Sequence, residues 1–156
     1  SGMKLLELLD PGVVKIGLEA IDKEESFEEL VDLLVRAGRL RDREAALNAL
    51  YAREEMRSTG IGNGIAIPHG KDASIQQITA AAGTSEEGIE FDAIDGQPVH
   101  LVFLVLAEAD NPGPHLQTLS EIATCLNEPG AYDRLVHART PDEFLEALSA
   151  GEEDLL

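Results

Sequence analysis

The chain has 156 residues, a length suited to one domain with its own core. Hydrophobic residues make up 44% and aromatic residues only 4%, so the core is expected to consist of Leu, Ile, Val and Ala. With 30 acidic and 12 basic residues the formal net charge is −18, which argues against nucleic acid and anionic membranes as partners because their phosphates would be repelled. We interpret the acidity as a solvated surface.

The single cysteine and the short apolar runs predict a cytoplasmic domain. Ser1 and Gly2 resemble the remnant of a cleaved tag, so the domain is expected at residues 3–150, with a flexible tail at 151–156. Cys125 is the only cysteine of the sequence, which excludes an intramolecular disulfide and fits a reducing compartment. The longest apolar run, 99–107, is too short to span a bilayer, so no membrane insertion is expected.

The first half of the chain predicts a short helix, a strand and two longer helices. The segment "MKLLELLDPG" reads as a helix that ends before a proline, and "VVKIGL" as a strand. Ser26 and Glu29 form a capping-box pattern, which predicts a helix starting there and ending near Gly38. The next helix is expected to begin around Asp42 and to carry Arg53 near its end.

The second half predicts strands followed by helices. Apolar runs at 65–69, 78–84 and 99–107 read as strands, the last being apolar on both faces and therefore central. Helices are expected from about His115, within 128–138, and after the N-cap pattern that begins at Thr140. These elements predict the α/β class, as a three-layer α/β/α sandwich in one domain.

The stretch "STGIGNGIAIPHGK" at 58–71 raises the question of function, because it places four glycines and His69 within fourteen positions. A nucleotide P-loop fails on spacing, since five residues separate Gly64 from Gly70 and Asp72 follows the lysine. A dinucleotide-binding loop would need glycine at position 65, where Ile65 stands. No nucleotide cofactor is therefore expected.

Metal binding and phosphoryl transfer remain as alternatives for His69. The four histidines show no metal-protease motif, and one cysteine cannot supply a paired ligand, so we expect no metal site. A metal-dependent hydrolase built on His69 and His115 is kept as a further alternative. A phosphohistidine needs a neutral imidazole with one free nitrogen, nearby donors for the phosphoryl oxygens and room for a partner protein. Glycines, Pro68 and the hydroxyls of Ser58 and Thr59 suit those needs.

The stretch "REEMRSTGIGNGIAIPHGK" at 53–71 resembles the IIA component of the bacterial phosphoenolpyruvate:sugar phosphotransferase system. The resemblance is to the fructose/mannitol superfamily, and most closely to its nitrogen-regulatory branch. It extends to "FDAIDGQPVHLVFLVLAEAD" at 91–110 and "HLQTLSEIATCL" at 115–126, and so covers nearly the whole chain. It implies a mixed sheet flanked by helices on both faces.

The resemblance also assigns roles to individual residues. His69 becomes the phosphorylated residue, through Nε2, and Arg53, sixteen positions earlier, the arginine that contacts the phosphoryl group. His115 becomes the second, non-phosphorylated histidine, and Arg57 is a departure from the branch pattern that we expect to face solvent. Support for the phosphoryl pocket is expected from Ser58, Thr59, Gly60, Gly62, Asn63 and Gly64.

The function that the resemblance implies is that of a phosphoryl carrier, a phosphotransferase component without a metal or other cofactor. The donor would be a histidine phosphocarrier protein. The group would then pass to a IIB sugar-transport component, or the phosphorylation state would itself regulate a target protein, as the nitrogen-type resemblance favours. A binding-only regulatory module with His69 as its switch is the remaining alternative.

Overall fold

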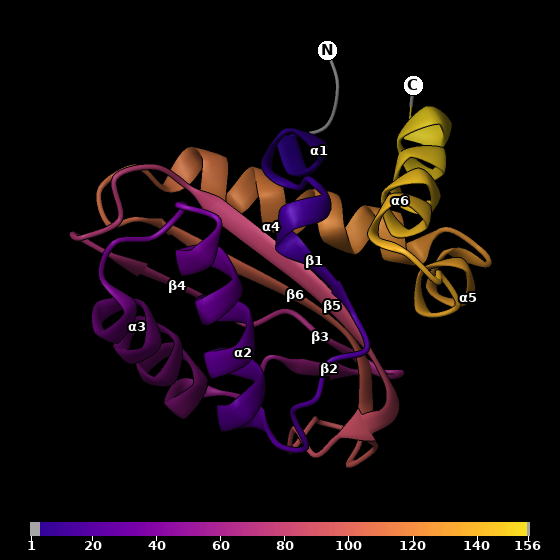
Figure 1. Cartoon of the computed structure of the whole chain (residues 1–156), viewed down its shortest axis with the longest axis horizontal. Coiled ribbons are helices and arrows are strands. Elements are labelled where there is room, and N and C mark those ends of the chain that lie inside the picture. Colours follow the sequence, from indigo (N-terminus) through magenta and orange to yellow (C-terminus); the bar gives the residue numbers. More distant parts are fainter. Residues whose placement is uncertain (1–3, 156) are drawn as a thin grey trace.

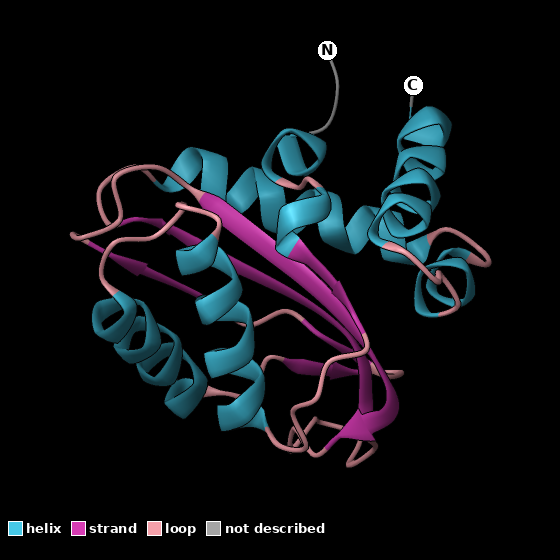
Figure 2. Ribbon diagram, viewed as in Figure 1, coloured by secondary structure: helices cyan, strands magenta, loops and turns pink. Residues whose placement is uncertain are grey.

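The computed structural model describes residues 4–155, so the expected tag remnant at residues 1–2 lies outside the described residues. A mixed six-stranded sheet lies between two layers of helices, which confirms the predicted α/β/α class (Figures 1 and 2). The strands are β1 (Val14–Ile16), β2 (Gly60–Gly62), β3 (Ile65–Ala66), β4 (His69–Asp72), β5 (Thr79–Ile89) and β6 (Val99–Glu108). The helices are α1 (Lys4–Leu8), the 3-10 turn η1 (Pro11–Val13), α2 (Lys23–Arg36), α3 (Arg43–Met56), α4 (Pro112–Asn127), α5 (Ala131–Val136) and α6 (Pro141–Leu155).

Strand β6 is the centre of the sheet, as its apolar sequence predicts. It pairs antiparallel with β5, and β5 pairs in parallel with β1. On its other side β6 pairs in parallel first with β3 and then with β4, and the chain between these two short strands breaks at Ile67–Pro68. Strand β2 pairs antiparallel with the outer side of β3, so of the two only β4 lies at the edge of the sheet. The break falls immediately before His69 and decides where the histidine side chain can point.

The helices divide between the two faces of the sheet. Helices α2 and α3 pack on one face, over β5 and β4, while α4 and α5 lie on the other face, over β6 (Figure 1). Helix α1 packs against α4 and α6 (Figure 1). Arg53 on α3 and His115 on α4 therefore approach β4 from different layers.

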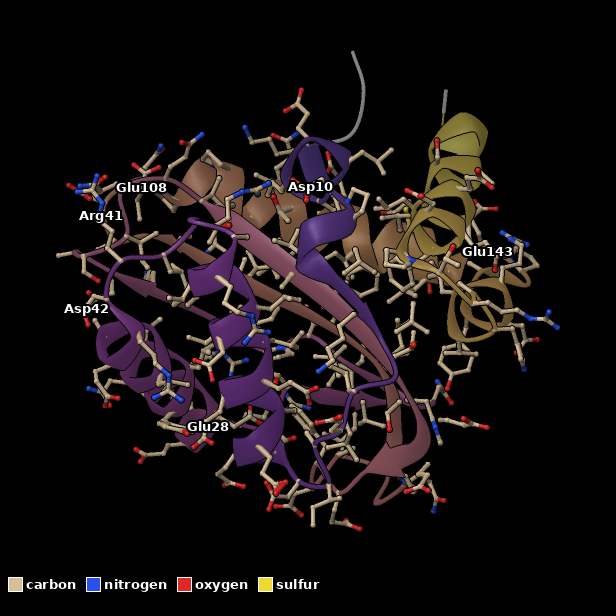
Figure 3. All side chains as sticks on the ribbon, in the orientation of Figure 1. Asp10, Glu28, Arg41, Asp42, Glu108 and Glu143 are labelled. Atoms are coloured by element: carbon tan, nitrogen blue, oxygen red, sulfur yellow. The ribbon has the colours of Figure 1, made fainter. Side chains whose placement is uncertain are left out.

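The core is aliphatic with four buried phenylalanines. Phe27 packs against Phe91 at 5.9 Å between ring centroids, and Phe103 against Phe144 at 5.8 Å. Charged side chains cover the outside of the molecule, and Glu28, Asp42 and Glu143 are exposed (Figure 3). A polar exterior of this kind agrees with the interpretation of the acidity as surface charge.

The start of α2 differs from the prediction. The helix begins at Lys23 with Asp22 as its N-cap, whose carboxylate accepts a hydrogen bond from the Glu25 N–H at 2.9 Å. Ser26 instead lies inside the helix, fully buried, and its hydroxyl donates to the Lys23 carbonyl. The capping box expected at Ser26 is therefore wrong, because the Asp22 cap adds a turn that buries Ser26 beside Phe27.

Other helix ends lie where the sequence places them. Asp42 caps α3 through the Ala45 N–H at 3.0 Å, and Thr140 accepts from the Glu143 N–H at 3.1 Å at the start of α6. The C-cap of α2 is Ala37, next to the predicted end at Gly38. Helix α6 continues to Leu155, through the stretch where a tail is expected from residue 151.

Candidate functional site

His69 is the first residue of β4 and is half-buried. Its Nδ1 lies 2.8 Å from the carbonyl oxygen of Ile67, which belongs to the break between β3 and β4. Because a carbonyl can only accept, Nδ1 carries the proton and Nε2 is left with a lone pair. The Ile67–Pro68 break is thus what fixes the tautomer of this imidazole.

Gly70 allows helix α3 to pack closely against β4 beside His69. A Cβ added to Gly70 would lie 2.9 Å from the backbone carbonyl of Ala49, so only glycine lets α3 approach β4 this closely. Arg53 lies one helical turn beyond Ala49. Its Nη1 donates to the Arg57 carbonyl at 2.8 Å, which holds the guanidinium over the end of the helix.

Burial has the largest effect on the pKa of His69. It lowers the pKa of the imidazole; the Ile67 carbonyl opposes this, the Arg53 charge adds to it, and Glu54 opposes it. The lowered pKa favours the neutral imidazole, in which Nε2 is unprotonated. The side chain can therefore act as a nucleophile without a separate base.

His115 lies in the first turns of α4, and its ring meets His69 nearly edge to face. The ring centroids are 5.5 Å apart with an interplanar angle of 72°. His115 is only 8% exposed, and its buried Nε2 has no hydrogen-bond partner. Burial, and then the charges of His69 and Lys71, lower its pKa from the ordinary 6.5 to about 4. An orphaned buried nitrogen beside a nucleophile suits a site that a bound group completes.

The glycine loop is built differently from the expected phosphoryl pocket. Thr59 is buried, and its hydroxyl donates to Glu54 Oε1 at 2.6 Å, while the Ser58 hydroxyl oxygen accepts from the Gly60 N–H at 3.1 Å. A Cβ on Gly60 would lie 2.8 Å from Ala93. These residues serve the packing of the loop, and the structure does not bring the Thr59 hydroxyl to His69.

The remaining loop residues form a hairpin turn between β2 and β3. Asn63 and Gly64 both have positive φ, 57° and 81°, as a two-residue primed turn requires. The Asn63 N–H donates to the Asp95 carboxylate at 3.0 Å, and Gly62 lies against the same side chain. Gly64 bonds to Leu101, whereas His69 pairs with Val105, so the turn lies about 13 Å from His69 along β6. The structure does not bring this turn to the histidine.

Sequence reasoning missed two charged residues of the site. Lys71 shares a side of β4 with His69, since alternate residues of a strand face the same way, and its charge reaches His115. Glu54 is almost buried and binds Thr59. The two-residue spacing from His69 could have pointed to Lys71, but nothing in the local sequence marks Glu54.

The buried histidine predicts a pH dependence of stability. The folded state disfavours protonated His115. The contribution of the neutral ring to the free energy of unfolding is therefore complete above the unfolded pKa of 6.5 and is lost as the pH falls toward the folded pKa of about 4. Between about pH 7.5 and about pH 5 the parent should lose roughly 2 kcal/mol more of its free energy of unfolding than His115→Gln. Urea unfolding of both proteins at the two pH values measures this difference, and equal losses would contradict it.

Cavities of about 400 Å³ and 570 Å³ lie elsewhere on the protein. The first is lined by residues including Arg39, Arg41 and Thr79, the second by residues including His100 and Tyr132, and neither includes His69, Arg53 or His115.

Among the described side chains no group of three or more His, Cys, Asp and Glu is arranged to hold a metal ion; that no metal binds stays a prediction. No helix in residues 4–155 is long and apolar enough to cross a membrane.

Comparison with known proteins identifies relatives along the whole chain. "PTS system fructose-specific EIIABC component" of Bacillus subtilis (strain 168) is 39% identical over 147 residues, which are 94% of this chain but only 23% of that protein. "PTS system fructose-specific EIIA component" of Haloferax volcanii is 41% identical over 127 residues, 81% of this chain and 82% of the relative. "Nitrogen regulatory protein" of Pseudomonas aeruginosa is 34% identical over 140 residues, 90% and 91% of the two chains.

Solved structures agree in fold and in family. The nitrogen regulatory protein IIA-Ntr of Neisseria meningitidis matches with a TM-score of 0.84 and 34% identity, over 92% of this chain and 97% of that one. IIA mannitol of Escherichia coli matches with a TM-score of 0.77 and 26% identity, over 90% and 98%. The sequence model described as "Phosphoenolpyruvate-dependent sugar phosphotransferase system, EIIA 2" matches residues 7–151. The resemblance predicted from the sequence is confirmed, and this chain belongs to the EIIA 2 family of the phosphoenolpyruvate-dependent sugar phosphotransferase system.

Proposed function

We propose that the chain is a phosphoryl carrier that accepts a phosphoryl group on Nε2 of His69 from a histidine phosphocarrier protein. The observation that carries this proposal is the arrangement of one neutral imidazole, its lone pair free, between the guanidinium of Arg53 and the buried ring of His115. Family membership supports the same assignment. In this role the chain is a phosphotransferase component that works through a phosphohistidine intermediate in the cytoplasm.

The transfer follows from the His69 tautomer. The Nε2 lone pair attacks the phosphorus atom of the donor, the donor N–P bond breaks, and its electron pair returns to the donor imidazole, whose other nitrogen carries a proton. The Nδ1–H of His69 stays on the Ile67 carbonyl, which stabilises the positive charge that the ring acquires. The reverse steps pass the group onward.

Two side chains are suited to hold the phosphoryl oxygens. Arg53 can offer guanidinium N–H groups beyond the one used on Arg57, and a guanidinium fits two oxygens of one phosphoryl group. His115 can donate from Nε2 if its tautomer places the proton there, which would also satisfy that orphaned atom. Both contacts strengthen as negative charge gathers on the transferring group.

The surface beside His69 supports a protein as donor. Met56, one turn beyond Arg53, is 81% exposed, and Leu116, next to His115, is 66% exposed. Large apolar side chains next to a charged centre are typical of protein docking sites, where a polar contact sits among apolar ones. A half-exposed nucleophile beside them suits a partner that presents its own phosphohistidine.

Two fates remain for the phosphoryl group. Relatives named fructose-specific, and a solved complex of mannitol enzyme IIA with phosphorylated enzyme IIB at 25% identity, favour transfer to a IIB component. Relatives named nitrogen regulatory protein favour regulation of a target protein by the phosphorylation state. Transfer from the labelled protein to purified IIB proteins separates the two.

The proposed function predicts one phosphoryl group per chain. Incubation with phosphoenolpyruvate, enzyme I and a phosphocarrier protein should increase the intact mass by a single phosphoryl group, because one histidine has the required surroundings. The product should be labile in acid and stable in base, as an N–P bond is, so spectra are taken at neutral or alkaline pH. No incorporation by the folded protein from any phosphocarrier tested would overturn the proposal.

A further inference from the structure

Glu54 follows Arg53 on α3, yet its carboxylate points into the protein and is only 7% exposed. Both oxygens bind the same residue: Oε2 accepts from the Thr59 N–H at 2.9 Å, and Oε1 accepts from the Thr59 hydroxyl at 2.6 Å. A carboxylate that takes two donors of one residue fixes both the position and the rotation of that residue. Glu54 thus pins the chain where it leaves α3 and turns toward β2.

The pinned residue is bonded to the segment that holds the nucleophile. The carbonyl of Thr59 accepts from the Ile67 N–H at 2.9 Å, and the Ile67 carbonyl accepts from Nδ1 of His69 at 2.8 Å. Three successive contacts therefore lead from the Glu54 carboxylate to the imidazole. Because each contact joins one residue to the next, a displacement of Thr59 would displace the Ile67 backbone and, through its carbonyl, the imidazole ring.

Lys23 supplies the charge that this buried carboxylate needs. Its Nζ lies 3.2 Å from Glu54 Oε2 and 5.5 Å from the centroid of the Phe91 ring, and its side chain is 17% exposed. A paired and fully hydrogen-bonded carboxylate is tolerated in the interior, whereas an unpaired one is strongly destabilising. Lys23, on α2, is therefore part of the same arrangement and ties α2 to the loop.

We propose that Glu54 is a positioning residue for phosphoryl transfer, which holds the Ile67 carbonyl, through Thr59, where it fixes the orientation and tautomer of His69. The proposal rests on the proposed function only in naming the reaction that benefits. In-line attack requires the Nε2 lone pair to be aimed at phosphorus, and a misplacement of about 1 Å costs on the order of a hundredfold in rate. Glu54 touches neither the imidazole nor the phosphoryl group.

The test compares Glu54→Ala with Glu54→Gln. Alanine removes both bonds to Thr59, so the phosphorylation rate should fall about tenfold to a hundredfold. Glutamine can still accept from the Thr59 N–H and donate to its hydroxyl oxygen, so it should stay within about threefold of the parent. Thr59→Val, which removes only the hydroxyl, paired with Thr59→Ser, which keeps it, repeats the comparison if Glu54→Ala does not fold.

A second readout distinguishes positioning from stability alone. The ¹⁵N chemical shifts of the His69 ring report which nitrogen carries the proton, without any phosphoryl donor. In the parent and in Glu54→Gln they should show the Nδ1–H form, and in Glu54→Ala or Thr59→Val they should move toward a mixture of the two tautomers. Folded Glu54→Ala and Thr59→Val with parental shifts and parental rates would overturn the proposal. Failure of the parent to be phosphorylated would overturn the proposed function alone, because the ring shifts would still decide the role of Glu54.

Discussion

His69→Ala is expected to take up no phosphoryl group under conditions that label the parent completely. Nε2 of His69 is the only nucleophile that combines a lowered pKa with a neighbouring guanidinium and a second buried imidazole among the described residues. Alanine removes the atom that forms the bond, so no residual rate is expected at this position. Intact mass and radiolabel from phosphoenolpyruvate, both kept away from acid, measure the loss.

His137→Ala is the matched control for this variant. His137 also places its Nδ1 on a backbone carbonyl, that of Asp133 at 2.7 Å, and so presents a bare Nε2 of the same tautomer. It is exposed on the C-terminal side of α5 and does not contact His115. His137→Ala should therefore be phosphorylated like the parent. Normal labelling of folded His69→Ala, or loss of labelling in His137→Ala, would move the site elsewhere.

Comparison of His69 with the other histidines explains why the local sequence is informative at His69. A bond from Nδ1 to a carbonyl is shared by His69, His100 and His137, and so does not mark a site by itself. Two neighbours distinguish His69. Pro68 marks the break in the strand before it, and Gly70 allows helix α3 to pack closely against β4. Both Pro68 and Gly70 are adjacent to His69, and the local sequence could therefore single out His69 as the candidate nucleophile.

The glycines before His69 show where such reasoning fails. Their pattern suggests a loop around an anion, but the groups that require them lie far along the chain: Ala93 against Gly60, Asp95 against Gly62, and Tyr132 against Gly64. A Cβ on Gly64 would lie 2.3 Å from the Tyr132 hydroxyl oxygen. Close packing and ligand binding both select glycine, and only the tertiary contacts decide between them.

The start of α2 was also ambiguous in the local sequence. Asp22 with Glu25, and Ser26 with Glu29, both fit a cap followed three residues later by an acid. The Glu29 carboxylate is taken by the N–H groups of Glu19 and Ala20, which are brought to it by the preceding loop. It is therefore unavailable as a capping partner for Ser26. The prediction used only the pair of Ser26 and Glu29, although the local pattern fits both positions, and the loop contact of Glu29 explains why the helix starts at the earlier one.

Arg53→Gln is expected to slow phosphoryl transfer to His69 about a hundredfold to a thousandfold. The phosphoryl group brings close to two negative charges onto a chain whose net charge is already −18. The Arg53 guanidinium stays protonated throughout, and its charge reaches His69 strongly enough to lower the pKa of the imidazole. Losing a contact that strengthens in the transition state costs about 2.7–4 kcal/mol, which corresponds to that loss in rate.

Arg57→Gln is the control that separates a specific contact from general electrostatics. It removes the same charge four residues further on, where the side chain is exposed, and it keeps the backbone carbonyl on which Arg53 rests. Quench-flow rates of Arg57→Gln should stay within about threefold of the parent, since exposed charges in salt contribute little. Arg53→Lys should lie between the two, because it keeps the charge but loses the planar pair of donors.

Thermal melts decide whether Arg53 acts on the reaction or on the fold. Its side chain is partly exposed, and it donates a hydrogen bond to a carbonyl at the end of α3. The melting temperature of Arg53→Gln should therefore stay within a few degrees of the parent, as is usual for surface substitutions. If Arg53→Gln transfers at the parental rate, or if Arg57→Gln is slowed equally, then Arg53 does not hold the phosphoryl group and net charge alone governs the transfer.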